Sequence, residues 1–379
     1  MLRTFRRRQF LQLAAAGALT PLAASRLLAE RPNRIVRVHS PQNHEWNFHS
    51  LDSFITPTES FYIRNHFAIP QIDLKQWRLK VEGAVETPLS LSMDDLQKLE
   101  SKTKPLLLEC AGNGRVFLTP PVRGVNWQLG AVGCAEWTGI PLAAILERAG
   151  VKREAVEIVL EGADRGTVAE PPSPGPIAFA RSLPLEKAKQ PEVVLAWGMN
   201  GKDLTTEHGA PLRAIVGGWY GMASVKWLTR ILVVDKPFQG FWQTLDYSYF
   251  QRVNGMPSLA PITEMQLKSQ IARPALGEIV PAGKPYTIVG AAWTGGDKIA
   301  QVEISIDDGK TWKAAKLTGK PVPYCWRLWE YEWPSPKPGK VRVMSRATES
   351  TGLAQPMERN ADYRTYMIHH VLPVDVEVR

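Results

Sequence analysis

Cysteine is scarce in this chain of 379 residues, which contains only Cys110, Cys134 and Cys325. Three cysteines are too few for the disulfide framework of a small secreted domain, and at least one of them must be free. The sequence also lacks C-x-x-C and H-E-x-x-H spacings, which argues against a zinc site. It lacks the C-x-x-C-H pattern that attaches a c-type haem as well. We expect Cys134 and Cys325 to be buried thiols, and whether they pair stays open.

Long runs of basic residues and long apolar runs are missing too. The 46 Lys and Arg against 37 Asp and Glu give a formal charge of +9, but no basic run is interleaved with aromatic residues. Nucleic acid is therefore not expected as a partner. The alanine-rich run that follows Arg8 is too short to span a bilayer as a mature helix, so we expect no stable membrane insertion after processing.

Proline and tryptophan, by contrast, are plentiful. The chain has 30 prolines and 13 tryptophans, and proline favours loops and sheet edges over long helices. Short apolar segments such as WRLKVEGAV and VEIVLEGA alternate with modest helical stretches such as PLAAILERAG. Because few helices are long enough for crossover connections, we predict a mixed α+β domain over residues 45–258.

The sequence pattern changes beyond about Ala260, where alternating, strand-like segments predominate. In VEISI the apolar residues Val302, Ile304 and Ile306 alternate with polar ones, and Asp308-Gly309 supplies a hairpin turn. Several such strands follow one another in about 110 residues, a number and spacing typical of an immunoglobulin-like sandwich. We therefore predict an immunoglobulin-like domain over residues 262–375.

The N-terminus resembles a twin-arginine export signal. In FRRRQFLQLAAAGALTPLAAS, Arg7 and Arg8 form the arginine pair, and an apolar run follows. We expect a signal peptide over residues 1–29 and a periplasmic mature protein. Removing these residues takes away five arginines and no acidic residue, which lowers the formal charge from +9 to +4. Export by this route usually follows folding around a cofactor in the cytoplasm.

The segment LLLECAGNGRVFL, residues 106–118, places Cys110 at the end of an apolar run and before the turn-forming residues 112–114. This pattern predicts a buried strand that ends at a ligand-binding loop. A free cysteine there is compatible with three roles. It is a small core residue, a nucleophile beside His66 or His208, or a soft ligand for a metal that an organic cofactor already holds.

Six motifs decide among these roles, because together and in this order they resemble the sulfite oxidase family of molybdenum enzymes. The similarity spans roughly residues 45–365 and includes the C-terminal sandwich, which is similar to that family's dimerisation domain. It implies a molybdenum-molybdopterin cofactor, a sulfite-oxidase-like α+β domain and a homodimer. The motifs are FYIRNH (61–66), ECAGNGR (109–115), EGAD (161–164), EHGAPLR (207–213), SVKW (224–227) and WQTLDY (242–247).

The resemblance implies a role for each matching residue. Cys110 matches the thiolate that ligates molybdenum. The residues expected to hold the pterin and its phosphate are Asn65, His66, Asp164, His208, Arg213, Ser224, Val225 and Lys226. The residues expected around the substrate anion are Arg64, Arg115 and Arg327, with Trp127 as a wall and Tyr247 as a hydroxyl near the metal. Arg327 lies in the predicted sandwich, so it would complete the pocket from the second domain.

The expected activity is oxidation of sulfite to sulfate. Since no haem-domain motif precedes the molybdenum domain in this sequence, electrons are expected to leave singly to a separate acceptor such as a c-type cytochrome. Two alternatives stay open: a sulfane-sulfur dehydrogenase or another sulfur-oxyanion or sulfoxide oxidoreductase of the same family, and a non-catalytic secreted binding protein with an immunoglobulin-like module.

Overall fold

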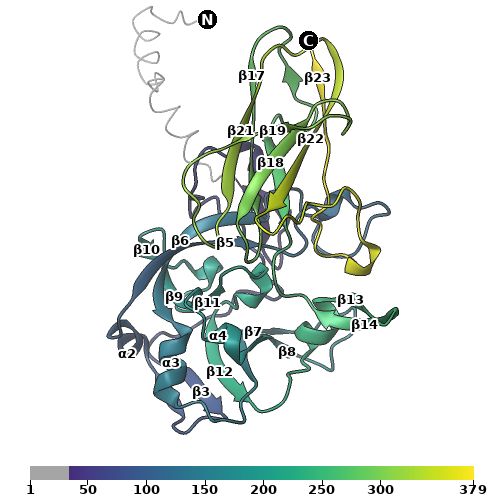
Figure 1. The fold of residues 1–379 in the computed structure, drawn as a ribbon. Coiled ribbons are helices and arrows are strands. Elements are labelled where there is room, and N and C mark those ends of the chain that lie inside the picture. The colour runs from purple at the N-terminus through teal and green to yellow at the C-terminus, as the bar shows by residue number, and fades with distance from the viewer. Residues whose placement is uncertain (1–33) are drawn as a thin grey trace, which may run out of the picture. The chain divides into compact units, whose positions relative to one another are not determined.

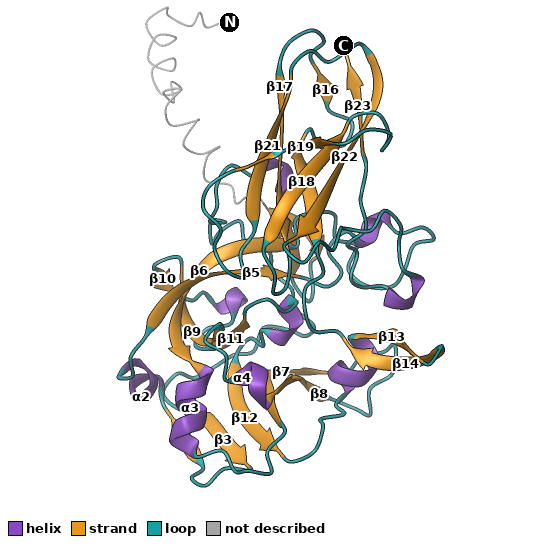
Figure 2. Cartoon of the chain, in the orientation of Figure 1, coloured by secondary structure: helices purple, strands orange, loops and turns teal. Residues whose placement is uncertain are grey.

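Strands dominate residues 34–379, the part of the chain that the computed structural model describes (Figures 1 and 2). We call residues 34–261 the first domain and residues 262–379 the sandwich domain. The predicted signal peptide, residues 1–29, lies outside the described residues. The predicted fold class, an α+β domain followed by a β-sandwich, is confirmed.

Two five-stranded sheets form the frame of the first domain. One sheet has the order β10-β9-β6-β5, with β11 also pairing β9, and all its pairs are antiparallel. Its strands are β5 (Lys102–Glu109), β6 (Val132–Pro141), β9 (Val193–Met199), β10 (Lys202–Asp203) and β11 (Arg213–Val216). The other has the order β4-β3-β12-β7-β8, in which β3 and β12 are parallel. Its strands are β3 (Leu79–Gly83), β4 (Leu89–Leu91), β7 (Glu157–Gly166), β8 (Ile177–Pro184) and β12 (Leu228–Val234).

Two smaller hairpins complete the strands of the first domain. They are β1 (Arg34–Val38) with β2 (Asn43–Trp46), and β13 (Ser248–Val253) with β14 (Met256–Pro261). The second hairpin projects from the side of the domain in Figure 1.

Helices are short throughout the described residues. The predicted helix PLAAILERAG forms α3 (Leu142–Ala149), which ends where Gly150 adopts a φ of +68°. Ser92 and Asp95 form a capping box at the start of α2 (Met93–Gln97). The remaining helical turns are α4 (Leu185–Ala188), η1 (Phe48–Ser50), η2 (Arg115–Phe117), η3 (Thr206–His208), η4 (Gly221–Ala223), η5 (Trp242–Asp246) and η6 (Ala361–Tyr363). Within residues 34–379, no helix has the length and apolarity needed to cross a membrane.

The sandwich domain consists of two mostly antiparallel sheets that pack face to face around a separate hydrophobic core. The sheets have the orders β15-β17-β21-β20 and β16-β23-β22-β18-β19. Of the three apolar residues predicted to alternate inward in VEISI, Val302 and Ile304 are buried, whereas Ile306 follows the end of the strand and is half-buried. Asp308 and Gly309 form a turn with positive φ. The strands are β15 (Lys268–Arg273), β16 (Ile279–Val280), β17 (Tyr286–Trp293), β18 (Ile299–Ser305), β19 (Lys313–Ala314), β20 (Lys316–Leu317), β21 (Arg327–Trp333), β22 (Gly339–Glu349) and β23 (Val374–Val378).

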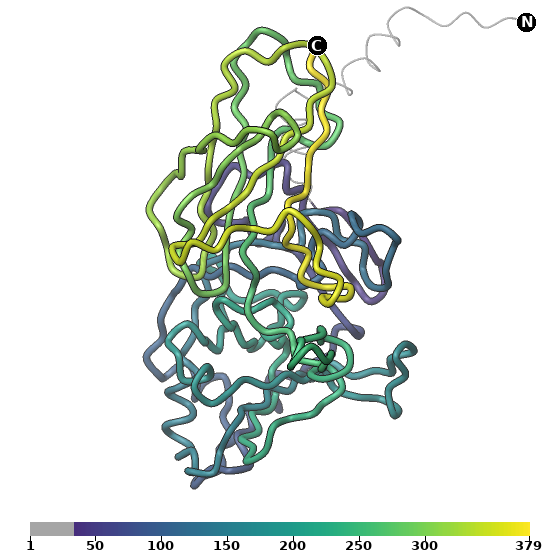
Figure 3. Tube along the Cα trace, turned by 45° about the vertical axis from the view of Figure 1, so that its right-hand side comes forward, coloured from purple at the N-terminus to yellow at the C-terminus, as the bar shows by residue number. Residues whose placement is uncertain are grey.

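The chain returns from the sandwich to the first domain before its last strand. In Figure 3 the yellow segment between β22 and β23 loops down to the junction of the two domains. The contact is direct, because the backbone N–H of Met367 donates to the carbonyl of Ala111 (2.8 Å). The loop that follows β5 is therefore bounded by both domains.

Candidate active site

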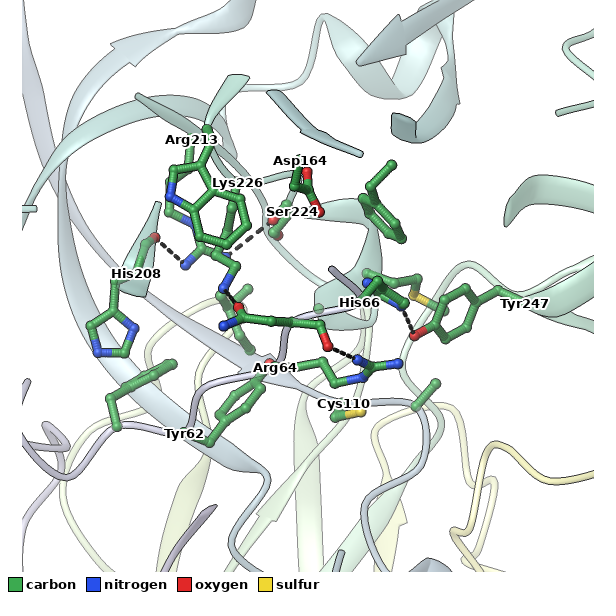
Figure 4. Close-up of a pocket in the computed structure, with 18 residues that line it drawn as sticks. Tyr62, Arg64, His66, Cys110, Asp164, His208, Arg213, Ser224, Lys226 and Tyr247 are labelled. Atoms are coloured by element: carbon green, nitrogen blue, oxygen red, sulfur yellow. Dashed lines mark hydrogen bonds between the residues drawn. The ribbon is translucent and has the colours of Figure 1, made fainter. Parts of the chain in front are cut away.

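Ten of the residues predicted from the sequence line one pocket of the first domain. They come from chain segments far apart in sequence, and Figure 4 draws the residues that line this pocket. The ten are Arg64, Asn65, His66, Cys110, Asp164, His208, Arg213, Ser224, Lys226 and Tyr247.

Cys110 lies at the end of β5, as the sequence predicts, and its side chain is only 6% exposed. The Cys110 N–H donates to the carbonyl of Ala131 (2.8 Å), and the Cys110 carbonyl accepts from the N–H of Asn113 (2.8 Å). A strand end followed by a closed turn holds the thiol at a fixed place on the pocket wall.

The segment 61–66 also lines the pocket, and Figure 4 shows Arg64 beside Cys110. It is anchored where Ile63 exchanges two backbone hydrogen bonds with His44 of β2. The Asn65 N–H donates to Asn43 Oδ1 (3.0 Å), and the Arg64 guanidinium donates to the same oxygen (3.3 Å) and to the Asn65 carbonyl. These bonds fix the direction in which the Arg64 guanidinium enters the pocket.

Basic groups gather at the other end of the pocket. The Arg213 guanidinium donates to the carbonyls of His208 (2.8 Å) and Ser224 (3.1 Å), as drawn in Figure 4. Lys226 Nζ donates to Asn65 Oδ1 and to the carbonyl of Glu207 (2.9 Å). Partners for both cations are thus neutral oxygens rather than carboxylates, which leaves their positive charge free to attract an anion.

Burial shifts the pKa values of these groups toward their neutral forms. It lowers the pKa of Arg213 to about 10, and burial with the nearby Arg213 charge lowers the pKa of Lys226 well below its usual value. Burial, reinforced by Arg213, likewise lowers the pKa of His208, so its imidazole is neutral at physiological pH. Burial also raises the pKa of Asp164 to about 6, although Lys226 opposes the shift. An anion bound among these cations would offset the cost of their desolvation.

A second group at the pocket joins a phenol to an imidazole. Tyr247 Oη lies 2.7 Å from His66 Nε2, and the imidazole ring stacks on Phe179 with centroids 4.2 Å apart. Burial, with the positive charge of Arg64 adding to it, lowers the pKa of His66 well below 6.5, and burial raises the pKa of Tyr247. Both groups are therefore neutral at physiological pH, and the tautomer of His66 decides which of the two donates the hydrogen bond between them.

An adjoining cavity of about 290 Å³ shares Arg64 and His66 with the pocket. Its wall includes an ion pair between Arg123 Nη2 and Asp246 Oδ1 (3.1 Å) and the ring of Tyr366. Because the two spaces meet at Arg64, this guanidinium faces any anion that passes from one to the other.

Four residues predicted from the sequence are not among the lining residues of either space: Arg115, Trp127, Val225 and Arg327. Val225 and Trp127 are fully buried, and Trp127 packs in the same apolar cluster as Cys110. Val225 contributes its backbone, accepting from the N–H of Ala214 (2.9 Å).

Arg115 is enclosed at the edge of the site. Its guanidinium donates to the carbonyls of Val125 (2.7 Å) and Thr365 (3.1 Å) and lies 5.2 Å from the ring centroid of Tyr366. A Cβ added at Gly112 would come within 2.3 Å of this guanidinium, so the glycine is required for the arginine to lie where it does.

The placement predicted for Arg327 is wrong in this structure. Its strand, β21, lies between β17 and β20, and its guanidinium donates to the carbonyl of Gly319 (3.0 Å) within the sandwich domain. The sandwich-side contribution to the site comes instead from the segment before β23, which supplies Tyr366. No local pattern in the sequence signals that residues 365–367 return to the first domain.

Sequence reasoning also missed Arg181. This arginine is fully buried, donates to the carbonyls of Trp242 and Ile262, and lies 5.9 Å from the Tyr247 ring. Burial lowers its pKa to about 10. Its hydrogen bond to Trp242 ties the turn η5 to β8, and thereby fixes the position of Tyr247, the residue that follows η5.

Comparison with known proteins identifies the class of this site. Residues 66–242 match the oxidoreductase molybdopterin binding domain, and residues 260–376 match the Mo-co oxidoreductase dimerisation domain. The chain is therefore a molybdopterin-dependent oxidoreductase with a dimerisation domain.

Individual relatives narrow the class further. The chain is 34% identical over 323 residues to the sulfite oxidase of Gallus gallus, covering 80% of this chain and 69% of that protein. It is 35% identical to the mitochondrial sulfite oxidase of Homo sapiens, where the match spans 58% of the human protein. The crystal structure of the sulfane dehydrogenase SoxCD from Paracoccus pantotrophus is similar with a TM-score of 0.80 and 28% identity, covering 96% of this chain and 92% of that one. The chain belongs to the sulfite oxidase family.

The pocket fits the molybdenum cofactor that this family implies. Asn65 Nδ2 and Arg213 Nε are buried and have no hydrogen-bond partner within residues 34–379, so each has a donor left for a ligand. The cations at one end suit the cofactor's phosphate, and the Cys110 thiol across the pocket suits a soft metal. Arg213, Lys226, His208, Ser224 and Asn65 would hold the pterin and phosphate, and Cys110 would ligate molybdenum.

Proposed function

We propose that this protein oxidises sulfite to sulfate in the periplasm and passes the electrons one at a time to a separate acceptor. In the overall reaction sulfite and water give sulfate, two protons and two electrons. When bound, the molybdenum cofactor supplies the oxygen transfer and the two-electron change, which no side chain of this chain can supply. The observation that carries the proposal is the pocket where Cys110, Arg64 and Tyr247 meet.

The chain's own residues bind and orient the anion. Arg64 lies where the pocket meets the adjoining cavity, and its delocalised charge suits a small oxyanion. The Tyr247 phenol stays protonated because its pKa is raised by burial, so it donates a hydrogen bond to an acceptor and does not act as a base. The neutral His66 ring, held against Phe179, fixes the direction of that phenol.

The second candidate is oxidation of sulfane sulfur. Its support is the similarity to the sulfane dehydrogenase SoxCD, which extends over nearly the whole chain. The two substrates differ in chemistry, since sulfite is a small oxyanion and sulfane sulfur is divalent sulfur bonded to another sulfur atom. Steady-state oxidation of sulfite and of a protein-bound persulfide, measured on one preparation, separates the two functions. Turnover of sulfite with kcat/KM at least tenfold higher supports our proposal, and the reverse preference favours the second candidate.

We further propose export by the twin-arginine route, a homodimer and a c-type cytochrome as electron acceptor. Support for the homodimer comes from the match of residues 260–376 to the dimerisation domain. Support for export comes from the arginine pair Arg7 and Arg8 in the sequence. Replacing both arginines by lysine and fractionating the cells tests the export route, because the lysine variant should accumulate with its cofactor in the cytoplasm.

A further inference from the structure

A buried ion pair joins the two domains immediately beside Cys110. Glu109, the last residue of β5, and Lys268, the first residue of β15, are each 2% exposed, and Lys268 Nζ lies 3.1 Å from Glu109 Oε1. The domains thus contribute one charge each to a buried ion pair.

Every group of this pair has further partners. The Trp293 indole N–H donates to Glu109 Oε2 (2.9 Å), and Asn113 Nδ2 donates to Glu109 Oε1 (3.1 Å). Lys268 Nζ also donates to the Asn113 carbonyl (3.3 Å). Since Trp293 faces Lys268 across β15 and β17, the sandwich presents a cation and an indole donor together to a single carboxylate.

These bonds close around the turn that carries Cys110. Asn113, which contacts both Glu109 and Lys268, donates its N–H to the Cys110 carbonyl and accepts at Oδ1 from the N–H of Ala131 (3.2 Å). Ala131 in turn accepts the N–H of Cys110. The backbone on both sides of the cysteine is therefore tied to groups that the sandwich domain holds.

Burying two charges gives little net stability, because the desolvation penalty offsets most of their attraction. A buried pair with several partners is better suited to fixing position, since buried charged groups that share partners allow few alternative arrangements. The position fixed here is that of the Cys110 turn.

We propose that Lys268 and Glu109 are positioning residues for the Cys110 thiolate, so that the sandwich domain sets the geometry of the metal ligand in addition to its part in dimerisation. The inference rests on the proposed role of Cys110 as the molybdenum ligand. It requires no change in the residues that bind the substrate anion.

The test is the double variant Glu109→Gln/Lys268→Met. Removing lysine alone would leave an uncompensated buried carboxylate and threaten folding, whereas the double variant is neutral and its glutamine oxygen keeps an acceptor for either Trp293 or Asn113, but not for both. The control is Gln270→Met, which removes another hydrogen bond of β15 to the first domain, from Gln270 Nε2 to the Leu129 carbonyl (2.8 Å). Lys268→Arg, which keeps the charge, should retain most of the wild-type behaviour.

Two measurements distinguish positioning of the Cys110 turn from a simple contact between the two domains. In cofactor-free protein, amide exchange over residues 106–114 should rise about tenfold or more in the double variant and stay unchanged in Gln270→Met. In the holoenzyme, kcat should fall by about tenfold or more with KM for sulfite unchanged, because a small displacement of a reacting group is costly. If amide exchange and kcat are both unchanged in the double variant, the proposal is overturned. If Gln270→Met changes amide exchange and kcat as much as the double variant does, the ion pair is only one of several contacts that hold the domains together. Full activity in Cys110→Ser would instead overturn the proposed function.

Discussion

Asp164 gives the cofactor-free protein a pH-dependent stability that one substitution should remove. Its carboxyl is 4% exposed on β7, and burial raises its pKa from the usual 3.8 to about 6, with Lys226 opposing the shift. Because the folded-state pKa is the higher one, the folded protein holds this proton to a higher pH than the unfolded chain does. The stabilising contribution is therefore complete below about pH 4 and is lost as the pH rises through about 6.

The size of the effect follows from the shift of the pKa. A shift of roughly two units at about 1.4 kcal/mol per unit corresponds to about 3 kcal/mol. Asn imitates the protonated carboxyl, so Asp164→Asn should match the wild type near pH 4 and exceed it in free energy of unfolding by about 3 kcal/mol at pH 7. The lowered pKa values of His66 and His208, which come from their burial, act in the opposite direction but are present in both proteins.

Thermal unfolding of cofactor-free protein between pH 4 and pH 7.5 measures this difference. At roughly 2 °C per kcal/mol, the variant should melt about 6 °C above the wild type at pH 7. Asp203→Asn, on the exposed strand β10, serves as the control and should follow the wild type at every pH. A difference between Asp164→Asn and wild type that does not change with pH would refute the reasoning.

Three further substitutions test other parts of the site. Tyr247→Phe keeps the ring against Tyr366 (centroids 5.0 Å apart) but removes the donor, so kcat/KM for sulfite should fall roughly tenfold, and an unchanged value would show that the phenol only packs. Arg327→Met should leave KM for sulfite within about twofold, since its guanidinium is bonded inside the sandwich, and a large rise in KM would restore its predicted role. Gly112→Ala should displace the Arg115 guanidinium and destabilise the protein by about 1–3 kcal/mol, measured by denaturant unfolding; a stability equal to wild type would contradict the close approach.

Much of the site could be predicted because its residues lie in six short motifs that resemble those of a known family, and a few positions also follow from local pattern alone. Cys110 is an example, since an apolar run followed by glycine and asparagine is enough to place a thiol at a strand end. Alternation in VEISI was enough to predict a buried strand face. Such patterns depend only on neighbours in sequence.

Contacts between distant segments could not be predicted in this way. Nothing near Tyr366 indicates that it returns to the first domain, and nothing near Lys268 indicates a carboxylate partner 159 residues earlier. Arg327 was assigned to the pocket from the family resemblance, although its guanidinium in β21 donates to the carbonyl of Gly319. Register and interdomain packing depend on the whole fold.

The most direct test of the central claim is an anaerobic electron count on holoenzyme with about one molybdenum per chain. Sulfite is added in limited amount with oxidised c-type cytochrome, and sulfate and reduced cytochrome are measured together. We predict one sulfate for every two cytochromes reduced, and no reduction with the Cys110→Ser variant. A preparation that carries molybdenum but forms no sulfate, or a serine variant that keeps the activity, would contradict the account.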